Sequence, residues 1–497
     1  MIKPKTTIII THKFNDTRVA ILENGRLVEF YIEREGIENN VGKIFKGKVE
    51  NIVKGLRGAF VNIGLRKNGF LPLAEIPEEI FGIDLEEEEE KIKRPKKEEL
   101  PINIGDQIFC QVVKEQIGEK GARLTSFIHL PGKYVVFFPT ISRIGVSQRI
   151  ANKKERNRLK EIAKKLKKPN RGLIIRTAAE NMPEEVIVRD YHYLEGKWEE
   201  IEREFQKSRA PRLLYREPKL ALKIVRDLYT LDTEAIYIDD RNLYYEICNY
   251  IKNYTPELFN KDKIIFYEDK EPIFKKFKID EELEKALARE IPLKSGGFIT
   301  IDQTEALVTI DVNTGSFASE EDPETLILQT NLEAAAEIAR QIRLRDLSGL
   351  IIIDFIDMRE QKNRERVYQE LKLCLANDRA KADFGKLSRF GLVEMTREKT
   401  RPSLFFTLCE ECPACKGRGR ILDRYEVCLK IESYLINKTE KIKGKKILLL
   451  VSPYLYEFLT NEWNERLNQL IKKIGVHLEL KMNPKFKYDE YKFLEEI

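Results

Sequence analysis

The sequence predicts a multidomain protein of α/β and α+β architecture, in which a small β-barrel is inserted into an interrupted first domain. Three observations predict this fold class. The chain has 497 residues, enough for roughly three or more domains. Glycines separate short apolar stretches between residues 41 and 125, which is typical of a small closed barrel. Beyond residue 288, strands alternate with a long helical stretch, which is typical of a parallel sheet.

The first elements follow from local patterns. Residues 5–33 alternate apolar and polar side chains around Asn24-Gly25, a dipeptide that favours a tight turn, so we expect a hairpin. Residues 84–99 have almost no apolar content and predict a solvated loop. Residues 151–169 predict a basic amphipathic helix, and residues 173–175 predict the strand that follows it.

Two later apolar runs, at 235–238 and 264–267, resemble the opening hairpin in character. Both lie among helical stretches, so they need strand partners from elsewhere in the chain. We therefore expect residues 1–40 to rejoin residues 222–287 in one domain that is interrupted by an insertion.

The second half has a different pattern. Residues 298–301, 307–310 and 350–353 predict strands, and residues 323–345 predict the helix that joins the last two. A strand, a crossover helix and a second strand form a parallel unit. Residues 422–497 predict a small mixed domain.

Two carboxylates end the strands of this parallel unit. Asp311 and Asp354 each follow an apolar strand, and Asn313 lies two residues beyond the first aspartate on the same side. Neighbouring strands lie ~4.8 Å apart, so the two carboxylates could share one hard cation such as Mg²⁺. The alternative is that each aspartate only ends a strand and caps the next element. That alternative fits Asp357 better, because residues 357–360 have the pattern of a capping box.

A cysteine cluster follows the predicted parallel unit. Cys412 and Cys415 have the CxxC spacing that lets two thiolates bind one zinc ion. Tetrahedral zinc takes four ligands, so the set could be completed by Cys409 with a distant residue such as Cys428, or by the same CxxC of a second chain. A site without metal, with two free thiols in a turn, is the remaining alternative.

Composition narrows the class of protein. The net charge is +6, from 88 basic and 82 acidic residues, so only local basic patches can indicate an anionic partner. No apolar run approaches the roughly 20 residues of a membrane span, and the start lacks the pattern of a signal peptide. Seven cysteines, an odd number, favour reduced thiols or a metal over disulfides. We therefore expect a cytoplasmic protein without stable membrane insertion.

Four motifs in order give the chain a family resemblance. DVN at 311–313, GLIIIDFIDM at 349–358, SRFGLVEMTR at 388–397 and CPAC at 412–415 resemble the ribonuclease E/G family of bacterial endoribonucleases. The resemblance covers nearly the whole chain and matches the members without a long scaffold tail. It implies an RNase H-like domain in two pieces (1–40 and 222–287), an S1 domain (41–126), a 5′ sensor (127–221), a DNase I-like catalytic domain (288–408), a zinc link (409–421) and a small domain (422–497).

The resemblance also implies a reaction. Asp311 and Asp354 would hold Mg²⁺, and Asn313 would support the metal or the scissile phosphate. Water bound to the metal would attack phosphorus and leave a 5′-phosphate and a 3′-hydroxyl in single-stranded ribosomal RNA precursors or mRNA. No histidine lies in these motifs, which disfavours a metal-free mechanism with cyclic products. The arginines at 340, 343 and 345 suit nearby phosphates, with surface salt bridges as the alternative.

RNA-binding residues follow from the same resemblance. Phe60 and Phe70 match the aromatic platform of the S1 domain, and Lys114 and Lys120 match its basic contacts. The alternative for each phenylalanine is a place in the barrel core. A non-catalytic protein that only binds RNA through its S1 barrel is the rival reading of the whole chain.

The 5′ sensor is the last implied site. Arg176 and Thr177 match the family's pocket for a 5′-monophosphate, and the backbone N–H that the family uses there would be that of Val136. The alternative is an ordinary surface strand end. One departure from the family is Gln148, where a basic residue is common, although Arg149 follows it. Zinc shared through Cys412 and Cys415 would make a homodimer, and the sequence leaves open whether dimers pair into tetramers.

Overall fold

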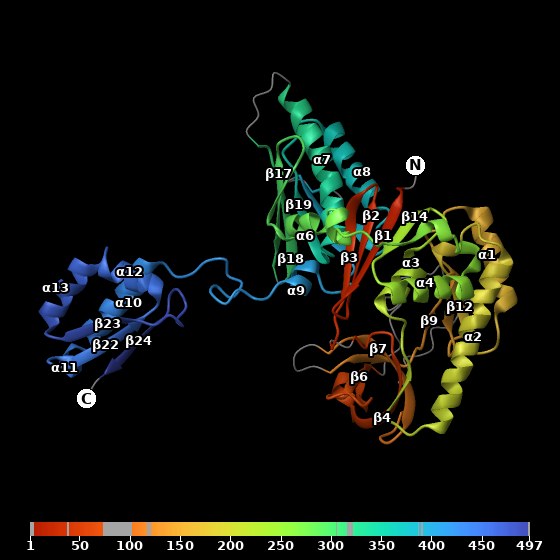
Figure 1. Cartoon of the computed structure of the whole chain (residues 1–497), viewed down its shortest axis with the longest axis horizontal. Helices are drawn as coiled ribbons and strands as arrows, with labels where there is room; N and C mark the ends of the chain where they lie inside the picture. The colour runs from red at the N-terminus through yellow and green to blue at the C-terminus, as the bar shows by residue number, and fades with distance from the viewer. Residues whose placement is uncertain are drawn as a thin grey trace. The chain divides into compact units, whose positions relative to one another are not determined.

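The fold is known from a computed structural model, which describes residues 4–36, 39–72, 102–116, 121–304, 306–315, 322–385, 387–388 and 391–495 (Figure 1). The chain divides into two compact units, Met1–Leu404 and Phe405–Ile497. The predicted loop at 84–99 lies outside the described residues. Among the described helices, none is long and apolar enough to cross a membrane.

The first sheet joins the two ends of the interrupted region. Its strands, in the order β15-β14-β1-β2-β3, are β15 (Ile264–Phe266), β14 (Thr233–Ile238), β1 (Thr6–Lys13), β2 (Asp16–Glu23) and β3 (Arg26–Glu33). β14 runs parallel to β1, so the expected rejoining of these segments is confirmed. The Asn24-Gly25 turn joins β2 to β3, but the single hairpin was wrong: Phe14 and Asn15 adopt positive φ values of 52° and 65° and form a second turn. The helices of this region are α3 (Leu220–Leu228), α4 (Arg241–Tyr254), α5 (Ile273–Lys276) and α6 (Ile279–Leu287).

The glycine-rich segment forms a closed barrel, as predicted. Its strands are β4 (Ile44–Val53), β5 (Gly58–Asn62), β6 (Gly69–Pro72), β8 (Arg123–Thr125) and β7 (Gln107–Lys114). They pair in that order, and β7 pairs back onto β4 to close the ring. β13 (Arg212–Tyr215) pairs with β4 from outside the ring.

A third sheet and two helices follow the barrel. The strands, in the order β11-β12-β10-β9, are β11 (Ile144–Val146), β12 (Gly172–Ile175), β10 (Val135–Phe138) and β9 (Leu130–Pro131). The predicted basic helix is α1 (Lys153–Leu166), which buries Leu159, Ile162 and Leu166 at helical spacing. The longer α2 (Glu184–Lys207) packs its apolar face into the same core.

The second half forms the predicted parallel unit within a six-stranded sheet. Its strands, in the order β16-β17-β18-β19-β21-β20, are β16 (Glu290–Pro292), β17 (Phe298–Gln303), β18 (Leu307–Asn313), β19 (Gly349–Asp354), β21 (Leu392–Arg397) and β20 (Ala382–Phe384). The crossover helix is α7 (Pro323–Leu344), which begins after Asp322, whose side chain accepts a hydrogen bond from the Thr325 backbone N–H. α7 and α8 (Gln361–Leu375) lie side by side, and their buried residues share one apolar core with those of the sheet (Figure 1).

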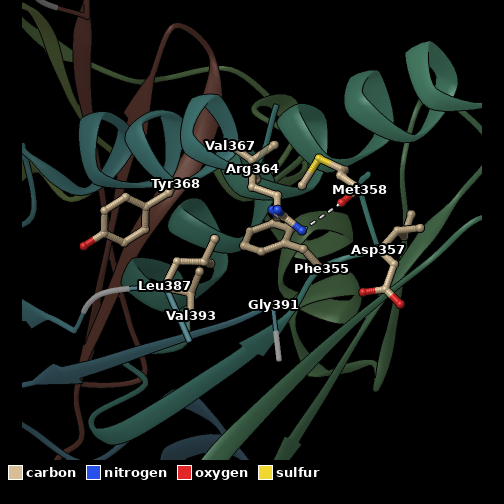
Figure 2. Close-up of a pocket in the computed structure, with 10 residues that line it drawn as sticks. Phe355, Asp357, Met358, Arg364, Val367, Tyr368, Leu387, Gly391 and Val393 are labelled. Carbon is tan, nitrogen blue, oxygen red and sulfur yellow. Dashed lines mark hydrogen bonds between the residues drawn. The ribbon is translucent and has the colours of Figure 1, made fainter. Parts of the chain in front are cut away.

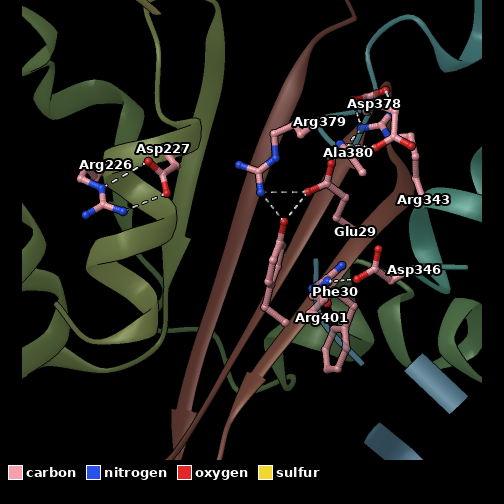
Figure 3. A network of polar contacts seen from close by, with 12 residues as sticks. Glu29, Phe30, Arg226, Asp227, Arg343, Asp346, Asp378, Arg379, Ala380 and Arg401 are labelled. Atoms are coloured by element: carbon pink, nitrogen blue, oxygen red, sulfur yellow. Dashed lines mark hydrogen bonds and ion pairs between the residues drawn. The ribbon is translucent and has the colours of Figure 1, made fainter. Parts of the chain in front are cut away.

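Buried ion pairs connect these parts of the first unit (Figure 3). Arg397 on β21 donates to Asp378 at 2.6 Å and 3.1 Å and to Asp346, and all three side chains are almost fully buried. Glu29 on β3 lies beside Arg343 of α7 and Arg379. Burial opposes the charge of Glu29, but the two guanidinium groups hold its pKa at about 2. Removal of one side chain of such a pair would leave the other charge buried without a partner.

The second unit is a small mixed domain. A three-stranded sheet has the order β23-β22-β24, from β22 (Lys446–Val451), β23 (His477–Met482) and β24 (Tyr491–Glu495). Its helices are α10 (Arg424–Asn437), α11 (Thr439–Ile442), α12 (Pro453–Thr460) and α13 (Asn464–Ile474), while α9 (Leu404–Leu408) spans the boundary between the units. The apolar core of this unit is its own.

Candidate functional site

The paired aspartates lie at one edge of the six-stranded sheet. β18 and β19 are parallel neighbours in a register that places Asp311 directly beside Asp354. Asp354 is the last residue of β19 and Asp311 lies two residues before the end of β18; both side chains are exposed while the residues before them are buried. The structure therefore brings together the two carboxylates that the sequence placed at strand ends.

The electrostatics of this edge favour a cation. The pKa of Asp354 is raised by partial desolvation of its carboxyl and by repulsion from the carboxylates of Asp311 and Asp357. Asn313 donates its side-chain N–H to Asp311 Oδ2 at 2.7 Å, which orients that carboxylate. None of the three aspartates forms an ion pair within the described ranges. A hard divalent ion would relieve the repulsion, so these residues fit Mg²⁺.

The predicted capping box at 357–360 is wrong. Helix α8 begins at Gln361 after Glu360, whose side chain makes no capping hydrogen bond. The carboxylate of Glu324 on α7 accepts the backbone N–H groups of Arg359 and Glu360 at 3.2 Å and 3.3 Å instead. Asp357 is thereby left at the same edge as Asp354, where it adds a third negative charge.

The arginines of the crossover helix are structural. Arg340 pairs with Glu337 and Glu282, and Arg343 pairs with Glu23 and Glu29. Arg345 donates to Gln341 Oε1 and to the Ala288 carbonyl, and it is buried. The suggestion that these side chains bind phosphates was therefore wrong, because their donors hold α7 against the rest of the unit.

The barrel presents an aromatic pair on its outer surface. Phe60 and Phe70 are directly opposed on β5 and β6, with ring centroids 5.7 Å apart in an edge-on arrangement. Their neighbours along the strands are buried in the barrel core, whereas the two phenylalanines are half-buried. A Cβ at Gly58 would come within 2.2 Å of the Phe70 ring, so this glycine makes room for the ring. The alternative of core packing does not hold for either residue.

Two basic residues lie on the barrel strands next to the aromatic pair. Arg123 on β8 lies opposite Phe70, and Lys114 on β7 lies opposite Arg123; both basic residues are exposed. Lys120 lies outside the described residues. Sequence reasoning missed Arg123, although its place two residues beyond Gly121 in a barrel strand was a usable signal. Aromatic rings flanked by basic side chains suit the stacked bases and backbone of single-stranded RNA.

The predicted 5′-phosphate residues gather at the end of β12. Arg176 follows this strand and donates Nη1 to the Gly132 carbonyl and, at 2.8 Å, to Asp227 Oδ1. Thr177 shares a hydrogen bond of 3.0 Å with Ser147. Val136 lies on the neighbouring strand β10, opposite Ile174.

The ion pair with Asp227 is the part of this cluster that sequence reasoning missed. Asp227 lies 51 residues from Arg176, and no motif connects the two. The same carboxylate also accepts hydrogen bonds from buried Arg226. Whether this cluster binds a terminal phosphate stays a prediction.

The cysteine cluster belongs to the second unit. Cys412 is exposed and Cys415 half-buried, and backbone N–H groups of Cys415 and Ala414 lower the pKa of the Cys412 thiol. Burial raises the pKa of Cys428 to about 12, and this residue packs in the domain core, which removes it as the distant ligand. Within the described residues, no group of three or more His, Cys, Asp or Glu could hold a metal ion.

Comparisons with known proteins match both the barrel and the six-stranded sheet. The chain matches the model of the Ribonuclease E/G family over residues 129–400 and that of the S1 RNA binding domain over residues 38–125. It is 38% identical over 477 residues to Ribonuclease G of Escherichia coli (strain K12), which is 96% of this chain and 97% of that relative. Ribonuclease G of Haemophilus influenzae is 40% identical over 448 residues, or 90% of each chain. Ribonuclease E of the same organism is 35% identical over 475 residues, which are 95% of this chain and 50% of that longer relative.

Proposed function

The chain belongs to the ribonuclease E/G family, and from this membership we propose that it is an endoribonuclease that cuts single-stranded RNA in the processing and decay of ribosomal RNA precursors and mRNA. The observation that carries the proposal is the parallel register that sets Asp311 beside Asp354. A protein that only bound RNA would have no use for adjacent unpaired carboxylates beside a polyanion. The S1 domain supplies the RNA-binding part.

We propose that Asp311 and Asp354 hold Mg²⁺. The repulsion that raises the pKa of Asp354 supports a cation between them. When bound, Mg²⁺ would supply positive charge beside the scissile phosphate and lower the pKa of a water molecule. Asn313 keeps the Asp311 carboxylate in one orientation through its 2.7 Å hydrogen bond.

The expected products carry a 5′-phosphate and a 3′-hydroxyl. Attack by water that breaks the bond between phosphorus and the 3′ oxygen gives these ends, whereas attack by the 2′-hydroxyl would give a cyclic phosphate. The motifs at 311–313 and 349–358 contain no histidine that could serve as the base for the second route.

Two further surfaces position the RNA in this proposal. Phe60 and Phe70 stack bases while Lys114 and Arg123 contact the backbone, which the cross-strand arrangement of these four residues supports. At the end of β12, Arg176 with Thr177 and the backbone of Val136 would bind a 5′-monophosphate and so stimulate cleavage.

The assembly belongs to the proposal as well. Cys412 and Cys415 supply two thiolates, so zinc shared with the same pair of a second chain would make a homodimer, and dimers could pair into tetramers. We also propose the RNase H-like, S1, 5′ sensor, DNase I-like, zinc-link and small-domain order with the boundaries given above. A cytoplasmic location follows from RNA precursors and mRNA as substrates.

One experiment tests the reaction. The protein is incubated with a 5′-monophosphorylated AU-rich oligonucleotide, single-stranded or annealed to its complement, with Mg²⁺ or with a chelator. We expect internal cuts with the stated ends only in the single strand and only with Mg²⁺. Binding without cleavage under all conditions would support the rival, an RNA-binding protein without catalytic activity.

A further inference from the structure

A pocket lies where the catalytic strand β19 ends (Figure 2). Its volume is about 250 Å³, and it is formed by the residues that follow Asp354, by α8, by the chain before β21 and by β21 itself. Phe355 at its wall is the residue directly after Asp354. The lining of the pocket therefore begins one residue beyond Asp354, and neither of the paired aspartates belongs to it.

The wall of the pocket is apolar. Phe355, Met358, Val367 and Val393 line it, and all four are buried in the core that α8 shares with the sheet. Leu387 also lines the pocket and is only half-buried, so part of its side chain is accessible to solvent. A flat apolar group can therefore enter between side chains that the core already holds in place.

Three polar side chains line the pocket, Asp357, Arg364 and Tyr368, and the Tyr368 hydroxyl donates to the Gly385 carbonyl at 2.7 Å. Arg364 is held in place by two hydrogen bonds, from Nη1 to the Met358 carbonyl at 3.2 Å and from Nη2 to Gln361 Oε1 at 2.9 Å. Asp357 is exposed and accepts no hydrogen bond from the described part of the chain. The pocket thus combines apolar walls with one free acceptor.

We propose that this pocket takes a nucleobase of the RNA, from a nucleotide close to the scissile phosphate. The inference rests on the proposed function, because it needs RNA at the edge that carries Asp311 and Asp354. The carboxylate of Asp357 disfavours a phosphate in the pocket, because it adds to the negative charge of that edge. A base has an apolar face for the pocket walls and N–H groups for the carboxylate.

The free carboxylate gives the pocket a base preference. Adenine, cytosine and guanine carry an exocyclic amino group that donates to Asp357. Uracil has a single N–H between two carbonyl oxygens, which the carboxylate repels. The pocket therefore favours amino-bearing bases over uracil at one position of the substrate, by roughly 10- to 100-fold for one hydrogen bond to a charged group.

A substrate series tests this preference. Single-stranded RNAs that differ in one base at each position near the cut are compared by kcat/KM for wild type, Leu387→Trp and Asp357→Asn. Leu387→Trp adds bulk at the wall of the pocket, whereas Leu373→Trp adds a tryptophan at an exposed position of α8 that does not line it. We expect one position with a preference against uracil in wild type and in the Leu373 control.

The variants should change that preference in different ways. Leu387→Trp should reduce it to nearly none. Asp357→Asn should restore efficient cleavage of the substrate with uracil at that position, because the asparagine amide can donate a hydrogen bond to a carbonyl oxygen of uracil. The same preference in Leu387→Trp and in its control, or no discrimination against uracil at any position, would overturn the proposal. Should Leu387→Trp fail to fold, the Asp357→Asn comparison decides alone.

A second readout does not depend on cleavage. RNA that carries 6-thioguanine at the selected position is irradiated in complex with the Asp311→Asn variant, and the crosslinked peptide is identified. We expect the crosslink on the peptides of Met358 or Leu387. A crosslink there without any cleavage by wild type would refute the endoribonuclease and keep the pocket. Cleavage with crosslinks elsewhere only would refute the pocket and keep the endoribonuclease.

Discussion

Replacing Arg176 by alanine is expected to remove any preference for 5′-monophosphorylated RNA over 5′-hydroxyl RNA. The side chain is 27% exposed at the end of β12. Only Nη1 is used by the protein, for Gly132 and Asp227, and the other guanidinium nitrogens have no partner among the residues that the structure describes. Those nitrogens are free to donate to a terminal phosphate.

The size of the effect follows from the contact that is lost. A hydrogen bond to a charged group contributes about 1.5 to 3 kcal/mol, which corresponds to roughly 10- to 150-fold in affinity or rate. The fold should survive, because Asp227 keeps two hydrogen bonds from Arg226, at 3.2 Å and 3.1 Å. The substitution should therefore reduce the recognition of the substrate's 5′ end without lowering the stability of the protein.

The assay compares kcat/KM for two oligonucleotides that differ only in the 5′ group. Arg203→Ala is the matched control, since exposed Arg203 lies on α2 and donates to the Glu199 carbonyl of the same helix. Wild type and control should share one ratio, and Arg176→Ala should bring the ratio close to one. A preference that persists in Arg176→Ala would move the sensor to another part of the chain.

Three further predictions concern the metal sites and the buried ion pairs. Asp311→Asn and Asp354→Asn should each lower cleavage at saturating RNA and Mg²⁺ by about 100-fold or more while RNA binding stays close to wild type, and near-normal turnover of either variant would remove the metal assignment. Metal analysis with light scattering should give one zinc per two chains, and replacing Cys412 and Cys415 by serine should leave smaller, still folded species; one zinc per chain would contradict sharing. Arg397→Met should cost about 3 to 5 kcal/mol in urea unfolding because it removes the ion-pair partner of buried Asp378 and leaves Asp346 with Arg401 alone, and a loss below about 1 kcal/mol would refute this role.

Local signals in the sequence were sufficient for the parallel unit and its aspartates. Apolar runs that end in Asp311 and Asp354 define two buried strands, and an intervening helix fixes them as parallel neighbours. The closed barrel was predictable for a similar reason, since glycines mark the positions where its strands pack too closely for a side chain. Gly58 beneath the Phe70 ring is one such position.

Contacts between distant segments were beyond the reach of sequence reasoning. The box at 357–360 satisfies a local rule, yet Glu324 on another helix takes over its hydrogen bonds. The helix arginines satisfy a composition rule, yet partners such as Glu23 lie 320 residues away. In both cases the sequence pattern correctly identified groups that form hydrogen bonds or ion pairs. Their actual partners come from distant segments, which a local pattern cannot indicate.

The distribution of charge indicates that RNA binding and RNA cleavage depend on different surfaces of the protein. Buried carboxylates such as Glu29 and Asp378 are neutralised by arginine, whereas Asp311, Asp354 and Asp357 share one edge without such a partner in the described ranges. That edge repels a phosphate backbone until a cation binds, so the attraction for RNA must come from elsewhere, namely the basic and aromatic surface of the barrel. Removal of Mg²⁺ should therefore abolish cleavage while most of the RNA affinity remains. A higher salt concentration should instead weaken RNA binding before it affects the cleavage of bound RNA.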